Sequence, residues 1–153
     1  MNNFNFDEAK KALAEKGVFE SFTTGTSMKP LFKTHRDIIT VKPLDRPIKK
    51  NDVVLYKSER NEKLILHRVI KVNKDGSLVI RGDNTYNNET DVKPEDIVGV
   101  LVSFYRNGKF TDCNKSKKYK AYVLYVRANY PFRYAWKIKI RPFLGRTKRK
   151  IFK

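Results

Sequence analysis

Short apolar runs alternate with polar, turn-forming segments through most of the chain between residues 18 and 106. The runs are rich in Val, Ile, Leu, Phe and Tyr, and Gly, Pro, Asn and Asp separate them, which is typical of short β-strands. Six runs predict strands, at residues 18–24, 37–42, 52–57, 64–73, 77–81 and 97–106. Strands of this number and spacing predict a mainly β domain with a curled antiparallel sheet.

Turn and cap residues refine this pattern. Asp75-Gly76 lies between two runs and Asn107-Gly108 follows the last run. Both predict β-hairpins, because these pairs accept the positive φ angles of tight turns. Residues 7–16 predict a short helix that is capped by Asp7, buries Ala9 and Leu13, and ends at Gly17.

The pattern changes to helical spacing after Cys113. The apolar residues that recur at this spacing are Tyr119, Tyr122, Val123, Val126 and Tyr130. Pro131 is expected to break or bend the element, and a second piece follows at residues 132–141. The sequence therefore predicts three parts: an N-terminal helix (1–17), a β domain (18–112) and a basic, aromatic, helical C-terminal arm (113–153).

Charge is distributed unevenly between these parts. The chain carries a net charge of +18, yet residues 113–153 hold fourteen basic side chains, no acidic one, and nine of the 19 aromatic residues. Such an arm is suited to phosphate groups. We expect residues 118–153 to contact an anionic membrane surface, with aromatic side chains at headgroup level. Two alternatives are a helix packed on the β domain with a solvated basic face, and, less favoured, an arm that binds nucleic acid.

Several classes of protein are excluded by composition. The single cysteine, Cys113, allows no intramolecular disulfide and no cysteine-rich zinc site, and no metal or cofactor is expected. The longest apolar run, residues 97–102, is far too short to span a membrane, and the N-terminus lacks the pattern of a secretion signal. These features predict a cytoplasmic protein that is peripheral to the membrane; they leave its oligomeric state open.

The turn around Ser27 is the first candidate for chemistry. Gly25 permits backbone angles closed to other residues, and Pro30 fixes its own φ and disfavours helix at the residue before it, so the turn presents one hydroxyl in a defined direction. Most such turns are only turns, so the argument needs a base. Lys29 lies two residues after Ser27 in an extended turn and should point away.

The chain has two histidines. His35 lies in a polar turn and is expected to be exposed and inert, whereas His67 lies within a predicted strand. If the following hairpin centres on Asp75, His67 comes near Asp83, whose carboxylate would fix the imidazole tautomer. Asp91 is a second candidate for that role, and either aspartate could instead be a turn or surface residue.

Five short blocks then occur in an order that identifies a family resemblance. They are GTSMKP (25–30), KNDVV (50–54), LHRVI (66–70), RGDN (81–84) and EDIVG (95–99). Over residues 22–104 the chain resembles the signal peptidase I superfamily, which includes the self-cleaving SOS-type repressors. The resemblance implies that Ser27 is the nucleophile, and that His67 is the base, as in the branch that uses histidine in place of lysine.

The resemblance also orders the remaining expectations. It favours Asp91 over Asp83 as the partner of His67, whereas strand pairing favours Asp83. Gly25, Thr26, Met28 and Pro30 are expected to line the substrate site. The chain departs from the family in lacking the N-terminal membrane anchor, and Gly25 stands where some relatives carry an oxyanion-hole hydroxyl.

The expected function is that of a serine endopeptidase. It would remove a leader, signal or propeptide from a peptide or precursor protein by acyl-enzyme chemistry, with the substrate added as a strand along an exposed sheet edge. Alternatives are a self-cleaving regulator, although residues 1–20 are too few for a helix-turn-helix domain, and a non-catalytic module that binds nucleic acid or lipid through the arm.

Overall fold

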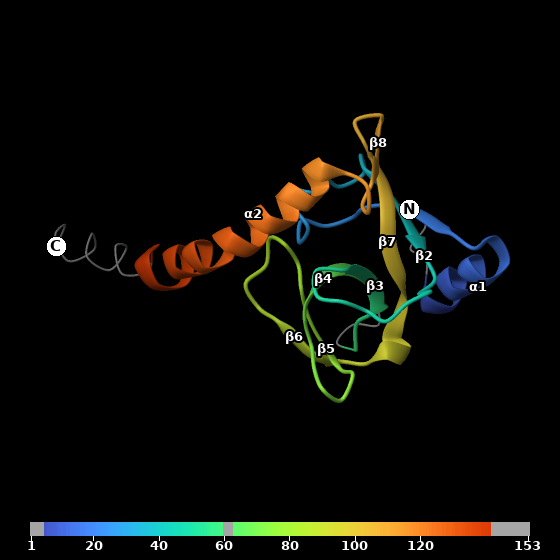
Figure 1. Cartoon of the computed structure of the whole chain (residues 1–153), viewed down its shortest axis with the longest axis horizontal. Coiled ribbons are helices and arrows are strands. Elements are labelled where there is room, and N and C mark those ends of the chain that lie inside the picture. The colour runs from blue at the N-terminus through green and yellow to red at the C-terminus, as the bar shows by residue number, and fades with distance from the viewer. Residues whose placement is uncertain (1–4, 60–62, 142–153) are drawn as a thin grey trace. The chain divides into compact units, whose positions relative to one another are not determined.

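The structure, a computed structural model of the chain, describes residues 5–59 and 63–141, with the side chains of Asp91 and Lys139 outside the described set. The chain divides into two compact units, Met1–Ser116 and Lys117–Lys153. The first unit contains eight strands and the second is helical (Figure 1).

The elements of the first unit follow the alternation of apolar and polar runs. It contains helices α1 (Phe6–Lys16) and η1 (Pro94–Asp96) and strands β1 (Phe19–Phe22), β2 (Ile38–Lys42), β3 (Val53–Lys57), β4 (Leu64–Val72), β5 (Leu78–Arg81), β6 (Glu89–Val92), β7 (Ile97–Arg106) and β8 (Lys109–Asp112). All six predicted strands are present, within a residue or two at their ends.

The strands form one antiparallel sheet in the order β1-β2-β7-β3-β4-β5-β6, with β8 paired to β7 off this path. The prediction of a mainly β, antiparallel domain is confirmed. The sheet is neither curled nor closed, so the predicted curled shape was wrong. Strands β1 and β6 stand at opposite ends of the path, and among the described strands they do not pair with each other.

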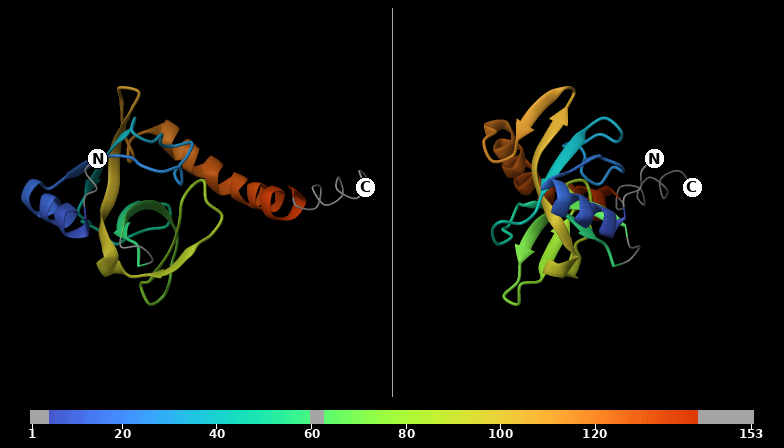
Figure 2. Two further views of the ribbon diagram at one scale, coloured as in Figure 1. Left: turned by 180° about the vertical axis from the view of Figure 1, so that it is seen from behind. Right: turned by 90° about the vertical axis from the view of Figure 1, so that its right-hand side faces the viewer.

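Strand β7 is the centre of this sheet. It pairs with β2 along one edge and with β3 and then β8 along the other. Figures 1 and 2 show it, coloured yellow to gold, as one continuous strand. At Gly99 an added Cβ would lie 2.3 Å from the carbonyl oxygen of Lys42 and 2.7 Å from Cγ1 of Val41. Glycine is therefore required at this close approach of β2 and β7.

The main core lies where β3, β4, β5 and β6 meet the start of β7. Its buried members are Val54, Tyr56, Val69, Leu78, Ile80, Val92 and Ile97. The loop between β1 and β2 also packs on β7, because the rings of Phe32 and Phe104 meet edge to face with their centroids 5.1 Å apart. Burial of these apolar surfaces fixes the register of the strands that carry the candidate site.

Two strands were not predicted. β6 lies inside the segment 82–94, for which the sequence predicts a polar turn. Its four residues, Glu-Thr-Asp-Val, are too few and too polar to predict a strand. β8 follows the predicted Asn107-Gly108 turn, where both residues have positive φ, 51° and 72°. That hairpin and the one at Gly76, φ 85°, are confirmed.

The N-terminal helix is confirmed with a different cap. Asn5, rather than Asp7, caps α1: its side chain accepts a hydrogen bond from the Glu8 N–H at 2.8 Å, and the Glu8 carboxylate accepts one from the Asn5 N–H at 3.0 Å. This reciprocal pair is a capping box. Gly17 ends the helix in the left-handed conformation, φ 69°, as predicted.

The second unit contains helix α2 (Lys117–Tyr134), followed by one π-helical segment, η2 (Ala135–Ile140). The helical arm is thus confirmed as far as residue 141. Pro131 was predicted to break or bend this element; it lies inside α2 and does not end it, so the break was wrong, and the bend stays a prediction. Residues 142–153 of the predicted arm lie outside the described residues. In the part of the chain that the structure describes, no helix is long and apolar enough to cross a membrane.

Candidate active site

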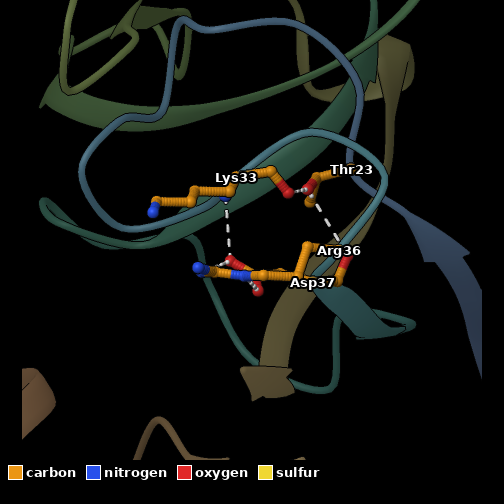
Figure 3. A network of polar contacts seen from close by, with 4 residues as sticks. All are labelled: Thr23, Lys33, Arg36 and Asp37. Carbon is orange, nitrogen blue, oxygen red and sulfur yellow. Dashed lines mark hydrogen bonds and ion pairs between the residues drawn. The ribbon is translucent and has the colours of Figure 1, made fainter. Parts of the chain in front are cut away.

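Ser27 lies on the loop that joins β1 to β2, and a polar network closes the base of this loop (Figure 3). Thr23 donates its N–H to the carbonyl oxygen of Asp37 at 3.0 Å and its hydroxyl to that of Lys33 at 3.1 Å. The Asp37 carboxylate accepts from the Lys33 N–H at 2.9 Å and from the Arg36 guanidinium at 2.7 Å. The two ends of the loop are thereby tied together.

Asp37 is fully buried, yet it remains suited to carry charge. Burial acts to raise its pKa, but hydrogen bonds from Arg36 and from the Lys33 N–H together hold the pKa below its usual value. The ionised carboxylate is therefore part of the folded loop, and its loss at low pH would loosen the segment that carries Ser27.

The tip of the loop is fastened to the turn that follows β5. The Asn84 N–H donates to the carbonyl oxygen of Ser27 at 2.7 Å, and the Asn84 side-chain amide donates to that of Thr26 at 3.2 Å. The Asp83 N–H points to the sulfur of Met28 at 3.5 Å. Met28 is only 6% exposed, so it anchors the loop in the interior.

Gly82 makes the close approach of loop and turn possible. A Cβ built on this glycine would lie 2.7 Å from the Ser27 carbonyl oxygen, 3.0 Å from the Ser27 Cβ and 3.0 Å from Nε2 of His67. The side chains of Ser27 and His67 therefore border the same small space, which only a residue without a side chain leaves open. The structure thus brings together the predicted nucleophile and the predicted base.

His67 lies on β4 opposite Val54 and is 7% exposed. Its Nε2 is buried and has no hydrogen-bond partner, a rare state for a buried polar atom. Its Nδ1 lies 3.2 Å from Oε1 of Glu89 and 3.2 Å from the Tyr56 hydroxyl. A carboxylate only accepts hydrogen bonds, so Nδ1 carries the proton in the neutral ring. The free lone pair is then on Nε2, which borders the same space over Gly82 as the Ser27 side chain.

Burial sets the charge of His67. Desolvation lowers its pKa below the ordinary 6.5, and the negative charges of Glu89 and Asp83 oppose this shift only in part. The ring is therefore neutral at pH 7 and able to accept a proton.

Asp83, the predicted partner of His67, pairs with Arg68 instead. Both of its carboxylate oxygens bond to the guanidinium of Arg68, each at 2.7 Å, and both side chains are 1% exposed. The expected contact between Asp83 and His67 was wrong because of a one-residue register shift between Val69 and Lys71. Arg68 consequently pairs with Arg81, which brings His67 opposite Gly82 and leaves Asp83 to Arg68.

Glu89 and Tyr56 were missed by sequence reasoning. Glu89 begins β6 and pairs with Ile80, two strands away from His67 on β4. It lies two positions before Asp91, the carboxylate that the resemblance favoured. The backbone of Asp91 is part of β6, but its side chain lies outside the described residues. Glu89 could have been found only by predicting strand β6, whose short and polar sequence gives no strand pattern.

The other predicted site residues lie around Ser27. Gly25 has φ 79°, as a tight loop requires, and Pro30 is exposed and follows a cis peptide bond. Thr26 is exposed and accepts the Lys29 N–H at 3.2 Å through its carbonyl oxygen. The side chain of Lys29 is exposed, in keeping with the expectation that it points away.

A pocket lies beside the two groups that contact Nδ1 of His67, although His67 itself is not among its lining residues. Tyr56 and Glu89, the two partners of Nδ1, help to line it together with Ser58, Thr90 and Val92. Because Ser27 lies on the Nε2 side of the ring, this pocket is separate from the space over Gly82. Among residues 5–59 and 63–141, no three His, Cys, Asp or Glu side chains gather into a metal site.

Comparison with known proteins adds no relative. No protein-family model matches the chain, and no curated protein matches it.

Proposed function

We propose that the protein is a serine endopeptidase in which Ser27 is the nucleophile and His67 is the general base. The observation that carries this proposal is the buried, unpartnered Nε2 of His67, which borders the same space over Gly82 as the Ser27 side chain. A buried lone pair without a donor costs stability, so a structural role explains it poorly. A nucleophile that arrives at that atom during catalysis explains it well.

The first chemical step forms an acyl-enzyme. Nε2 of His67 removes the proton from the Ser27 hydroxyl as its oxygen attacks a peptide carbonyl carbon. The tetrahedral intermediate then collapses, the C–N bond breaks, and the same proton passes from Nε2 to the departing amine. In the second step Nε2 takes a proton from water as the water oxygen attacks the Ser27 ester carbon. The acyl C–O bond then breaks, the proton passes from Nε2 to the Ser27 oxygen, and the acid product leaves.

Glu89 takes the supporting part in this mechanism. During both steps His67 becomes an imidazolium, and a carboxylate 3.2 Å from Nδ1 stabilises that charge and fixes the tautomer. The Tyr56 hydroxyl, at the same distance, steadies the ring on the same side. Asp83, paired with Arg68, supports the site through its backbone, which holds the loop at Met28.

The substrate class follows from the sequence resemblance. Signal peptidase-like enzymes remove leaders, signals or propeptides, with small side chains before the cut, and the five matching blocks all fall in the unit that holds Ser27 and His67. We expect the precursor to bind in extended form as an added strand. β1 leads into the loop of Ser27 and, among the described strands, pairs with β2 alone, so its other edge is the place we favour.

The decisive experiment combines a peptide library with an active-site label. Wild type, Ser27→Ala and a matched serine control in the β4–β5 turn, Ser77→Ala, are incubated with the library and with a fluorophosphonate, and products are read by mass spectrometry. Wild type and Ser77→Ala should cleave the same bonds and carry the label on the peptide that contains Ser27. Ser27→Ala should do neither while unfolding at the same temperature. Full cleavage by Ser27→Ala would refute the proposal.

The same samples test the self-cleaving alternative. The protein is stored alone at mildly alkaline pH and followed by intact mass. We expect the chain to remain whole and to cut only added peptides. Two fragments from wild type and none from Ser27→Ala, with no cut in any added peptide, would favour a self-cleaving regulator.

A further inference from the structure

The C-terminal unit has a charge pattern that no part of the proposed peptidase chemistry uses. Between residues 117 and 141, the helical part that the structure describes, the sequence carries eight Lys and Arg residues and no acidic one. In residues 1–112, by contrast, twenty basic residues face sixteen acidic ones. The helix therefore has a strong positive field with no carboxylate of its own to neutralise it.

Large apolar side chains are exposed on the same helix. Phe132 is 75% exposed, Leu124 64%, and Tyr125 and Trp136 58% each. Tyr134, Ile138 and Ile140 are also exposed. Aromatic and aliphatic side chains left in water at this density, among basic residues, mark an interaction surface.

Nucleic acid and an anionic lipid bilayer could both bind this positive surface, and the kind of apolar residue on it distinguishes between them. Nucleic acid rewards aromatic rings on which bases stack, but offers little to an aliphatic side chain. Leu124, Ile138 and Ile140 gain more from the acyl boundary of a bilayer, where Trp136 and the tyrosines can occupy the headgroup layer. Lipid phosphates then neutralise the lysines and arginines.

We propose that residues 117–141 bind an anionic membrane surface, with the helix lying in the plane of the interface. The occupant is a lipid bilayer with negative headgroups, and the helix lies on it because no described helix could cross it. Such binding would bring the peptidase unit to precursors held at the membrane. It requires only the arm, so it stands or falls independently of the chemistry at Ser27.

The chain contains a built-in probe for the test. Trp136 is its only tryptophan, lies in the arm and is exposed, so tryptophan fluorescence, excited at wavelengths that tyrosine does not absorb, reports the surroundings of the arm alone. The full-length protein is titrated with phosphatidylcholine vesicles, with vesicles that also contain phosphatidylglycerol, and with a DNA duplex. We expect the emission to shift to the blue, and the protein to sediment, with the anionic vesicles only, and high salt to weaken both effects.

Charge variants locate the contact. Lys117→Gln/Lys120→Gln in the arm is compared with Lys71→Gln/Lys74→Gln, two exposed lysines of the other unit, so that both proteins have the same net charge. At about fivefold per basic residue at an anionic surface, the arm variant, which loses two, should partition about 25-fold more weakly. The control should partition like wild type.

Apolar variants test insertion in the same way. Phe132→Ala/Ile138→Ala is compared with Phe110→Ala/Val72→Ala, whose side chains are similarly exposed on strands. The arm pair should lose about tenfold in partitioning, because apolar contact area is removed, and the strand pair should lose nothing. Circular dichroism confirms that the helix content is unchanged.

Each contrary result overturns the proposal. Equal losses in arm and control variants would mean that net charge alone binds the vesicles. A fluorescence shift with DNA and none with anionic vesicles would assign the arm to nucleic acid, and no response to either would leave the surface without a polyanionic partner. Ser27→Ala should bind vesicles like wild type, so failure of this proposal and failure of the peptidase proposal are distinguishable.

Discussion

Replacing Gly82 by alanine adds one methyl group at the point where the proposed nucleophile and base meet. The new Cβ would lie 2.7 Å from the Ser27 carbonyl oxygen, about 0.7 Å short of the 3.4 Å at which ordinary contact begins, and 3.0 Å from Nε2 of His67. The oxygen belongs to the backbone and is held by the Asn84 N–H, so it cannot rotate away as a side chain would. The loop or the strand must move.

A displacement of this size predicts a large catalytic loss and a modest loss of stability. Misplacement of reacting groups by about 1 Å can cost about a hundredfold in rate. Overpacking of a well-packed site destabilises a protein by about 1–3 kcal/mol. We therefore expect Gly82→Ala to lower kcat/KM by about 50–100-fold. Steady-state cleavage of a library-derived peptide measures kcat/KM, and urea unfolding measures the free energy of unfolding.

Gly99→Ala is the matched control. Its Cβ would meet the Lys42 carbonyl oxygen at 2.3 Å, an even tighter clash, between β2 and β7. If destabilisation alone caused the loss, Gly99→Ala would lose at least as much activity as Gly82→Ala at a temperature where both remain folded. Full activity in folded Gly82→Ala would refute the assignment of Ser27 and His67 as the reacting pair.

Four further outcomes follow from the site. Glu89→Gln should lower the pKa of His67 further, because a negative charge that raises this pKa is lost; NMR titration of the ring measures it. The same variant should slow cleavage about 10²–10⁴-fold, since the imidazolium loses the carboxylate that stabilises it. Because burial lowers the pKa of His67, the acid limb of kcat/KM should have its midpoint below pH 6.5. Arg68→Met should destabilise the protein by about 3–5 kcal/mol in urea unfolding, since it leaves the Asp83 carboxylate buried and unpaired. The pKa of Asp37 is lowered by folding, so the stabilising effect of its carboxylate is complete above about pH 4. This effect is lost as the pH falls through the lower pKa of the folded state. Asp37→Asn should therefore flatten the decline of Tm in this acid range.

Each of these expectations has a contrary result. An unchanged His67 pKa in Glu89→Gln would place the carboxylate too far away to matter, and an acid limb above pH 6.5 would mean that burial does not control the base. For Arg68→Met the check is the double variant Arg68→Met/Asp83→Leu, which should recover much of the loss; no recovery would separate the two residues energetically. A Tm profile for Asp37→Asn that is parallel to wild type down to pH 2 would show that the carboxylate is not linked to folding.

Local chemistry explains what the sequence predicts well. The hairpins at Gly76 and at Asn107-Gly108 and the helix end at Gly17 depend on one or two residues in the left-handed conformation, a requirement that can be read from a dipeptide. The long apolar strands, such as β7, bury most of their residues and are equally visible. Ser27 and His67 were singled out because turn chemistry and a histidine inside an apolar run are local signals.

Long-range geometry accounts for the errors. The shift between Val69 and Lys71 moves the partner of His67 by one residue, and no local pattern encodes that shift. Glu89 reaches His67 only because a four-residue polar strand, β6, pairs with β5. The open form of the sheet is likewise set by how its strands pair with one another, which no single strand encodes. A sequence can therefore nominate reactive residues more readily than the groups that orient them.

The strand order has a consequence for how activity arises as the chain folds. The loop of Ser27 belongs to the β1–β2 end of the sheet, whereas His67 and Glu89 belong to β4 and β6 toward the opposite end. They meet where Asn84 bonds to Thr26 and Ser27, a contact between segments about 58 residues apart in sequence. Such non-local contacts form late and slowly. A nascent or partly unfolded chain would thus hold Ser27 and His67 apart, and the proposed peptidase activity would appear only with the complete sheet.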